Sequence, residues 1–237
     1  MKLYSDLADW WHLLTPASDY AAEAAFYAQA LKNACAPPLR TLLELGSGGG
    51  NNASHLKSSF QMTLVDLEPA MLAVSRAQNP ECEHIHGDMR TLQLGREFDA
   101  VFIHDAIDYM TSECELRQAM ETAYIHCKPG GAALLAPDSI SENFKPTTNH
   151  EGTDGDGRGL RFLEWNYDSD PNDSVCTVDY IIAMRERDGS VRVEHDRHTF
   201  GLFPGETWLR LLSETGFLPE ILDGPAGTVV FVATKPA

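Results

Sequence analysis

Short apolar runs alternate with amphipathic stretches through the middle of the chain. Runs at 41–45, 62–65 and 98–103 have the length and apolar content of buried strands. Within 112–126, apolar side chains recur every three to four positions, which is the spacing of one face of a helix. Strands that alternate with helices form a parallel sheet with right-handed crossovers, and ligands bind beyond the carboxyl ends of its strands. We therefore predict an α/β fold for residues 39–138.

Different patterns flank this core. Residues 1–38 repeat apolar side chains at helical spacing, and Pro37 ends the pattern because proline lacks an amide donor. Residues 205–237 carry the pattern of one helix followed by two strands. We expect a single domain, 1–237, in which 1–38 form a helical lid over the core and 205–237 supply a closing helix and strands.

Residues 139–204 interrupt the alternation. Their first part, 141–160, is polar and contains several glycines, which predicts a mobile loop. Three extended runs follow, and Asp188-Gly189 between the last two is a strong signal for a two-residue hairpin. We predict an inserted antiparallel sheet with strands at 161–168, 175–187 and 190–199.

The first predicted strand ends in a glycine-rich loop. Residues 44–50 read Glu-Leu-Gly-Ser-Gly-Gly-Gly, and Asp66 ends the next strand. Glycines allow a tight turn and a close approach of the backbone to a ligand, and a carboxylate at the tip of the second strand can accept both hydroxyls of a ribose. A dinucleotide site usually has Gly or Ala where this chain has Asn51, and Glu44 would repel a pyrophosphate. The loop therefore predicts a nucleotide cofactor that carries a positive charge.

Three further segments extend this pattern into a family resemblance. They are Gly87-Asp88-Met89, the run from Phe98 to Asp105, and Cys127-Lys128-Pro129-Gly130-Gly131, which resembles the turn before a fifth strand. With the glycine loop, they resemble the class I S-adenosylmethionine-dependent methyltransferases in order and spacing. The resemblance implies a Rossmann-like, seven-stranded, mostly parallel sheet with helices on both faces, and S-adenosylmethionine as cofactor.

The same resemblance implies the cofactor-binding residues. In this sequence they are Tyr20, Glu44, Gly46, Ser47, Gly48, Asp66, Leu67, Asp88, Met89 and His104. By analogy, Glu44 faces the amino-acid end of the cofactor, Asp66 binds the ribose and Asp88 bonds the exocyclic nitrogen of adenine. Leu67 and Met89 would sandwich the adenine, although each is equally suited to a hydrophobic core.

Aromatic residues near the N-terminus point to one group within the family. Tyr4, Tyr20 and the run 193–203 resemble methyltransferases that dimethylate amino groups of nucleotide-linked sugars, in which an aromatic lid covers the cofactor. Ordinary helix packing also explains Tyr20. A pocket for a cation is a further hypothesis, although core packing is more usual for its candidate residues Trp10, Trp11 and Trp165.

His104 is the candidate catalytic residue. It follows the fourth predicted strand, where the transferred methyl group should lie, and a histidine there can take a proton from an amine or hydroxyl near neutral pH. Asp105 is placed to orient it. The alternative is a histidine that closes the cleft or bonds a backbone carbonyl.

The formal net charge of −17 at pH 7 restricts the partners of this chain. A polyanion would meet an unfavourable potential, and Lys and Arg form no cluster, which argues against nucleic acid. Because no segment approaches the ~20 apolar residues that span a bilayer and the first residues do not resemble a signal peptide, we expect a cytoplasmic protein without membrane contact. The five cysteines lack C-x-x-C spacing, and we predict no metal.

These observations lead to a functional hypothesis with open alternatives. We predict transfer of a methyl group from S-adenosylmethionine to N or O of a small-molecule acceptor by in-line displacement, with an amine slightly favoured. An NAD-dependent oxidoreductase and a non-catalytic cofactor-binding module are the alternatives. The inserted sheet is expected to be either a homodimer surface, since exposed edges invite pairing, or a substrate lid.

Overall fold

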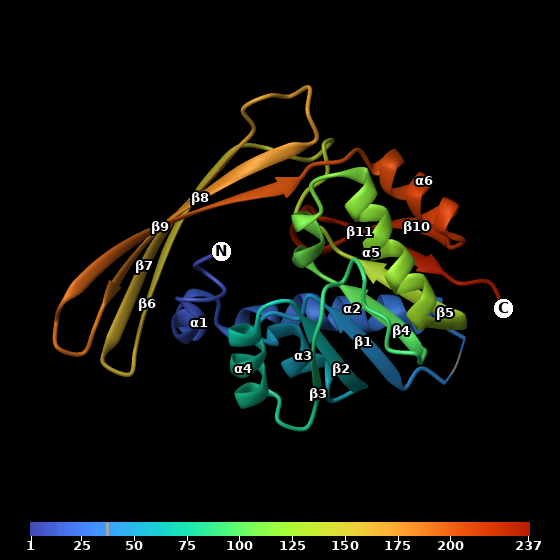
Figure 1. Ribbon diagram of the computed structural model, residues 1–237, viewed down its shortest axis with the longest axis horizontal. Helices are drawn as coiled ribbons and strands as arrows, with labels where there is room; N and C mark the ends of the chain where they lie inside the picture. The colour runs from blue at the N-terminus through green and yellow to red at the C-terminus, as the bar shows by residue number, and fades with distance from the viewer. Residues whose placement is uncertain (37) are drawn as a thin grey trace.

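Two separate β-sheets make up the structure, a computed structural model that describes residues 1–36 and 38–237. The smaller sheet stands to one side of the larger one, and the N-terminal segment lies between them (Figure 1). The strands of the larger sheet are, in spatial order, β10 (Leu218–Asp223), β11 (Val229–Thr234), β5 (Cys127–Leu135), β4 (Phe98–Ile103), β1 (Thr41–Leu45), β2 (Gln61–Asp66) and β3 (Glu83–His86).

The larger sheet is mostly parallel. All pairings from β5 through β4, β1 and β2 to β3 are parallel, whereas β11 pairs antiparallel with both β5 and β10. The predicted α/β class with a seven-stranded Rossmann-like sheet is therefore confirmed. Because the parallel strands end at one edge, the loops that follow β1, β2, β3 and β4 converge there.

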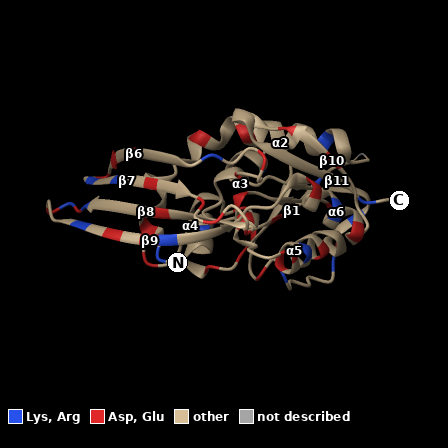
Figure 2. Ribbon diagram, turned by 90° about the horizontal axis from the view of Figure 1, so that it is seen from above, with Lys and Arg blue, Asp and Glu red and all other residues tan. Residues whose placement is uncertain are grey.

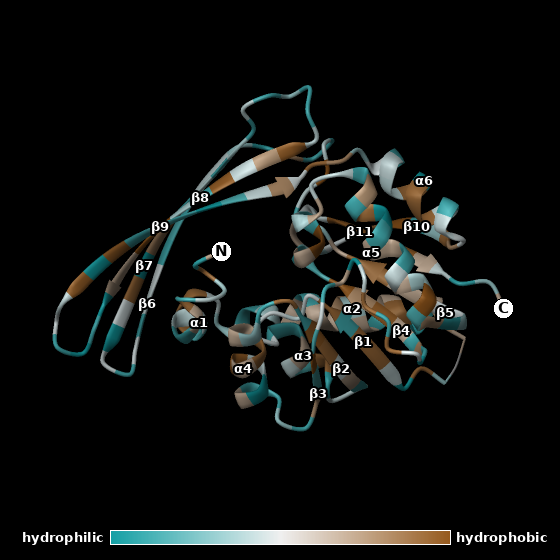
Figure 3. Ribbon diagram, viewed as in Figure 1, coloured by the Kyte–Doolittle hydropathy of each residue, from teal (hydrophilic) through white to brown (hydrophobic). Residues whose placement is uncertain are grey.

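Helices cover both faces of this sheet. Leu43 and Val101 pack with α5 and α6 on one face, and Leu42 and Phe102 pack with α2 and α3 on the other. Apolar residues concentrate in these strands, and the hairpin ends of the smaller sheet are hydrophilic (Figure 3). The longer helices are α2 (Ala21–Ala34), α3 (Asn51–Leu56), α4 (Pro69–Gln78), α5 (Glu113–His126) and α6 (Gly205–Thr215).

The inserted sheet has four antiparallel strands, one more than predicted. In order they are β6 (Thr147–Gly155), β7 (Arg158–Tyr167), β8 (Val175–Arg185) and β9 (Val191–Gly201). The predicted loop at 141–160 was wrong because it contains β6. This edge strand is mostly exposed, so it shows no apolar alternation. A Cβ at Gly152 would overlap the side chain of Arg161 on β7, so a larger residue there would have to displace that exposed arginine.

Charged side chains alternate in sign along the inserted sheet. Arg residues are interspersed with Asp and Glu along the sheet (Figure 2). Asp154, for example, pairs with Arg161 at 2.8 Å and with Arg185 at 3.2 Å. The hairpin predicted at Asp188-Gly189 joins β8 to β9.

The N-terminal segment packs against the inserted sheet. Its short helices are η1 (Ala8–Trp10), α1 (Trp11–Leu14) and η2 (Ala17–Tyr20). Leu3, Leu7 and Trp10 form a buried cluster with Leu160 and Ile182 of β7 and β8. The segment therefore joins the inserted sheet to the core. Pro37, predicted to end the helical pattern, lies outside the described residues.

One strand boundary also differs from the prediction. β5 begins at Cys127, so the segment Cys127 to Gly131, predicted as a turn, belongs to the strand. A register shift between Phe98 and Ala100 of β4 accommodates it. None of the helices in the described residues is long and apolar enough to cross a membrane.

Candidate active site

The loop after β1 runs close to the neighbouring strand ends. Gly46 and Gly48 have φ of +74° and +51°, a region in which residues with a Cβ are strained. The amide of Gly46 donates to the carbonyl of Val65 at 2.8 Å, which fixes the loop against β2. A Cβ on Gly46 would overlap the Cβ of Ala106 in η3 (Asp105–Tyr109), the turn that follows β4. The sequence therefore needs glycine here for both conformation and space.

A cavity of about 290 Å³ opens at this edge of the larger sheet. Its lining comes from the segments that follow β1, β2, β3 and β4 and from the N-terminal segment. The structure brings every residue predicted for the site into this lining, namely Tyr20, Glu44, Gly46, Ser47, Gly48, Asp66, Leu67, Asp88, Met89 and His104. Their roles toward a ligand stay predictions.

Four residues of the cavity lining carry buried polar atoms without a partner. Among the described residues, Glu44 Oε2, Ser47 Oγ, Trp11 Nε1 and Asn52 Oδ1 are buried without a hydrogen-bond partner, and all four residues line the cavity. Burial raises the pKa of Glu44 to about 8, and a cationic partner would restore its charge. The Ser47 hydroxyl and the Trp11 indole are donors suited to a carboxylate. This set fits the ammonium and carboxylate of the amino-acid end of S-adenosylmethionine.

Asp66 lies at the tip of β2 beside the glycine loop. Its Oδ2 accepts from the amide of Gly48 at 2.7 Å, and its Oδ1 accepts from the amide of Glu68 at 2.8 Å. These bonds orient the carboxylate and leave further lone pairs for the cavity. Leu67, the next residue, has 52 % of its surface exposed at the cavity. The position of Asp66 agrees with ribose binding, and that of Leu67 agrees with adenine binding.

Asp88 is held in its ionised form by an arginine. Its carboxylate accepts from Arg90 Nε at 3.0 Å and from Arg90 Nη2 at 2.7 Å, and this pairing lowers the pKa of Asp88. Arg90 in turn reaches Glu115 of α5 at 2.7 Å. Met89 lines the cavity, and its Cε lies close to Gly46. The segment after β3 is thus anchored to α5.

His104 lies between two carboxylates. Its Nδ1 is 3.2 Å from Asp105 Oδ1 and its Nε2 is 3.3 Å from Glu23 Oε1. Burial alone would lower the pKa of His104, but the negative charges of Asp105, Glu23 and Asp138 outweigh it and raise that pKa well above its usual value. The surrounding charges therefore favour the imidazolium near neutral pH, and the catalytic role of His104 stays a prediction. Its position agrees with the alternative of a histidine that closes the cleft.

The three tryptophans proposed as a cation pocket do not come together. Trp10 is buried in the cluster beneath the inserted sheet, and Trp165 is 52 % exposed and packs on Tyr167 with 5.0 Å between ring centroids. Trp11 alone of these three lines the cavity. The sequence spacing gave no sign of this separation, because β7 directs Trp165 to the outer face of the sheet.

A second, smaller cavity of about 40 Å³ lies between the larger sheet and the inner face of the inserted sheet. Asp108, Asp138, Glu164 and Tyr180 are among its lining residues. Asp138 keeps an exposed side chain, but its place in the gap between the sheets and the charge of Asp105 raise its pKa above the ordinary value, and burial raises that of Glu164. Sequence reasoning missed these residues because they come from separate segments. The gap between the sheets is therefore lined by carboxyl groups.

Comparisons with known proteins agree with this geometry. Residues 42–131 match the family model described as a methyltransferase domain. The chain is 31% identical over 217 residues to a dTDP-3-amino-3,6-dideoxy-α-D-glucopyranose N,N-dimethyltransferase of Streptomyces fradiae, covering 90% of this chain and 84% of that protein. These matches favour methyl transfer over the oxidoreductase alternative.

Solved structures show the same fold. A sugar N-methyltransferase from Streptoalloteichus sp. superimposes with a TM-score of 0.86 at 27% identity, over 94% of this chain and 90% of that one. An S-adenosylmethionine-bound amino pentose methyltransferase from Micromonospora echinaspora has a TM-score of 0.80 at 26% identity, over 91% of both chains. The chain therefore belongs to the class I S-adenosylmethionine-dependent methyltransferases, in the group that includes the sugar N,N-dimethyltransferases.

Proposed function

We propose that this enzyme methylates the amino group of a nucleotide-linked aminosugar. The observation that carries the proposal is the row of carboxyl groups beside the cofactor cavity. Asp105 lines that cavity, and Asp138 and Glu164 line the adjoining one. Carboxylates favour a cation, and the sugar end of such an acceptor carries one when its amine is protonated, so the carboxyl groups fit the aminosugar end and not the anionic diphosphate. The relatives whose names include aminosugar acceptors support the same assignment.

Different residues around the cavity would serve different parts of an in-line displacement. Bound S-adenosylmethionine supplies an electrophilic methyl group on a sulfonium. Glu44 and Ser47 would hold its amino-acid end, and Asp66 its ribose. The attacking amine must be neutral, so its proton has to leave first, and Asp138, which lines the gap between the sheets and has a raised pKa, is suited to receive it. The charges around His104 favour its imidazolium, which would orient Asp105 and Glu23.

A direct test uses the acceptor of the relative. Purified enzyme is incubated with S-adenosylmethionine and dTDP-3-amino-3,6-dideoxy-α-D-glucose, and products are identified by mass spectrometry. We expect N-methylated product, with no product from the analogue that carries a hydroxyl in place of the amine. Methylation of the hydroxyl analogue alone, or of neither compound by enzyme that binds the cofactor, would refute the proposal.

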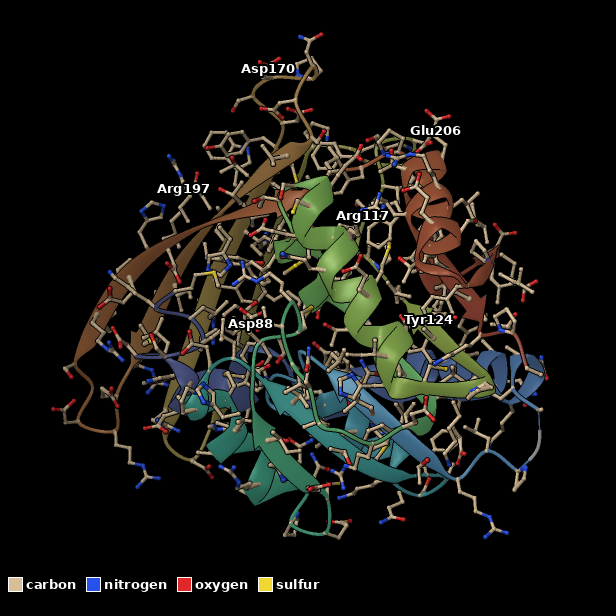
Figure 4. The ribbon with its side chains drawn as sticks, turned by 45° about the vertical axis from the view of Figure 1, so that its right-hand side comes forward. Asp88, Arg117, Tyr124, Asp170, Arg197 and Glu206 are labelled. Carbon is tan, nitrogen blue, oxygen red and sulfur yellow. The ribbon has the colours of Figure 1, made fainter. Side chains whose placement is uncertain are left out.

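Two variants test the role of the carboxyl groups beside the cofactor cavity. Asp138→Asn should raise KM for the amine about tenfold, the effect of losing one charge-assisted interaction, while the Kd for S-adenosylmethionine stays the same. The control is Asp170→Asn, because Asp170 lies on the loop between β7 and β8 that projects from the top of the molecule (Figure 4). Equal KM values for both variants would contradict the role of Asp138.

A further inference from the structure

A buried histidine on the inserted sheet is linked to the cofactor cavity through two tyrosines. His198 of β9 has a side chain with 0 % exposure. Its Nδ1 is 2.7 Å from the hydroxyl of Tyr109, and that hydroxyl is 2.8 Å from the hydroxyl of Tyr4. Tyr4 and Tyr109 both line the cavity. The chain of contacts therefore runs from the core of the inserted sheet to the cavity wall.

Asp196 fixes which nitrogen of His198 carries the proton. Its Oδ2 is 3.0 Å from His198 Nε2 and also accepts from the amide of Leu3 at 2.8 Å. An ionised carboxylate only accepts hydrogen bonds, so Nε2 must be the protonated nitrogen. The pKa of Asp196 is lowered, because its hydrogen bonds with His198 and Leu3 outweigh its burial. Burial also lowers the pKa of His198, which keeps the ring neutral.

The directions of the two tyrosine hydroxyls follow from this tautomer. Because Nδ1 of neutral His198 is an acceptor, the Tyr109 hydroxyl must donate to it. The Tyr109 oxygen is then left to accept, and the Tyr4 hydroxyl donates to it. The hydroxyl hydrogen of Tyr4 is then engaged with Tyr109. The Tyr4 oxygen can therefore offer only lone pairs to a ligand in the cavity that Tyr4 lines.

We propose that His198 and Asp196 are positioning residues that orient Tyr109 and Tyr4, so that the Tyr4 oxygen receives a hydrogen bond from the amino group of the methyl acceptor. This inference rests on the proposed function and extends it to a residue on the inserted sheet. The hydrogen-bonded series from Asp196 through His198 and Tyr109 to Tyr4, here called the relay, joins the N-terminal segment, η3 and β9. Lys2 adds to the same junction, since its ammonium pairs with Glu194 of β9 at 2.9 Å. The inserted sheet thus sets the hydrogen-bonding character of the cavity wall.

The tautomer is measured directly by NMR. Protein labelled with ¹⁵N in its histidines is studied by long-range ¹H–¹⁵N correlation at neutral pH, and the His198 signals are assigned by their loss in His198→Asn. We expect a neutral ring protonated at Nε2. A ring protonated at Nδ1, or an imidazolium, would overturn the relay. This readout needs no substrate, so it decides the relay even if the proposed acceptor is wrong.

Matched variants then test the consequence for catalysis. His198→Phe keeps a planar ring but offers Tyr109 no acceptor, and Tyr109→Phe removes the link itself. Both should lower kcat/KM for the amine about tenfold, the effect of one hydrogen bond, with the Kd for S-adenosylmethionine unchanged. His198→Asn places an amide oxygen near the Nδ1 position and should restore most of the loss. Equal losses in the Asn and Phe variants would show a merely structural role and refute the proposal.

Discussion

The carboxylate of Asp66 accepts a hydrogen bond from the backbone amide of Gly48 at 2.7 Å. This contact ties the tip of β2 to the glycine loop that follows β1. Because the other carboxylate oxygen accepts from the amide of Glu68, the side chain is oriented before any ligand arrives. Such preorganisation reduces the cost of ordering the site on binding.

Replacing Asp66 with Ala should weaken S-adenosylmethionine binding by roughly 1.5–3 kcal/mol, the value of hydrogen bonds to a charged acceptor. Isothermal titration calorimetry measures the change. Asp66→Asn is the matched variant, since its amide oxygen can still accept from one backbone amide and should retain part of the affinity. Unfolding followed by circular dichroism checks that both variants fold. An unchanged Kd in the Ala variant would remove Asp66 from the site.

Two glycines of the loop should respond very differently to alanine. A Cβ on Gly46 would overlap the Cβ of Ala106 and lie 2.8 Å from the Cε of Met89, whereas the nearest atom to a Cβ on Gly48 is 4.0 Å away. Gly48→Ala therefore adds only backbone strain, about 1 kcal/mol. Gly46→Ala adds overpacking of about 1–3 kcal/mol on top of similar strain. Urea denaturation of both variants would test this order, and equal destabilisation would contradict it.

The core of the fold was predictable because its signals are local. The apolar run of β1, the glycine loop and Asp66 follow one another closely in the sequence, and each specifies backbone geometry by its own chemistry. β6 could not be found this way, because an exposed edge strand needs no apolar side chains. The charge of His104 was also hidden, since Glu23 and Asp138 reach it from distant parts of the chain.

The outer face of the inserted sheet carries an apolar patch. Leu163, Trp165, Ile181 and Val193 are each at least 37 % exposed. Arg197 lies on this same side, away from the larger sheet (Figure 4). Contiguous exposed apolar side chains on a sheet that also has free edges favour association with a second copy.

We therefore predict a homodimer that forms through this face. Light scattering should give about twice the chain mass of 26.1 kDa, and Ile181→Glu should shift the protein toward the monomer, because it buries a charge in the interface. Leu218→Glu is the control, since Leu218 is equally apolar and 63 % exposed on β10. A monomeric wild-type protein would instead favour the role of a substrate lid for the inserted sheet.

Glu44 makes stability depend on pH in a direction opposite to that of most carboxylates. Its pKa is raised from the ordinary 4.5 to about 8 by burial, so the folded chain holds a proton that the unfolded chain releases. The contribution of protonated Glu44 to folding stability is fully present below pH 4.5 and is lost as pH rises through 8. Relative to Glu44→Gln, the wild type should lose up to ~4 kcal/mol of unfolding free energy between pH 5 and pH 8. Urea denaturation at the two pH values measures this difference.

Cofactor binding should reverse the effect. The ammonium of S-adenosylmethionine gives the ionised carboxylate a partner and removes the cost of burying its charge. The wild type should therefore bind the cofactor more tightly as pH rises from 6 to 8, whereas Glu44→Gln, which does not titrate, should show a flatter dependence. If the two proteins had parallel pH profiles for both unfolding and binding, Glu44 would be neither the titrating group nor the contact for the ammonium.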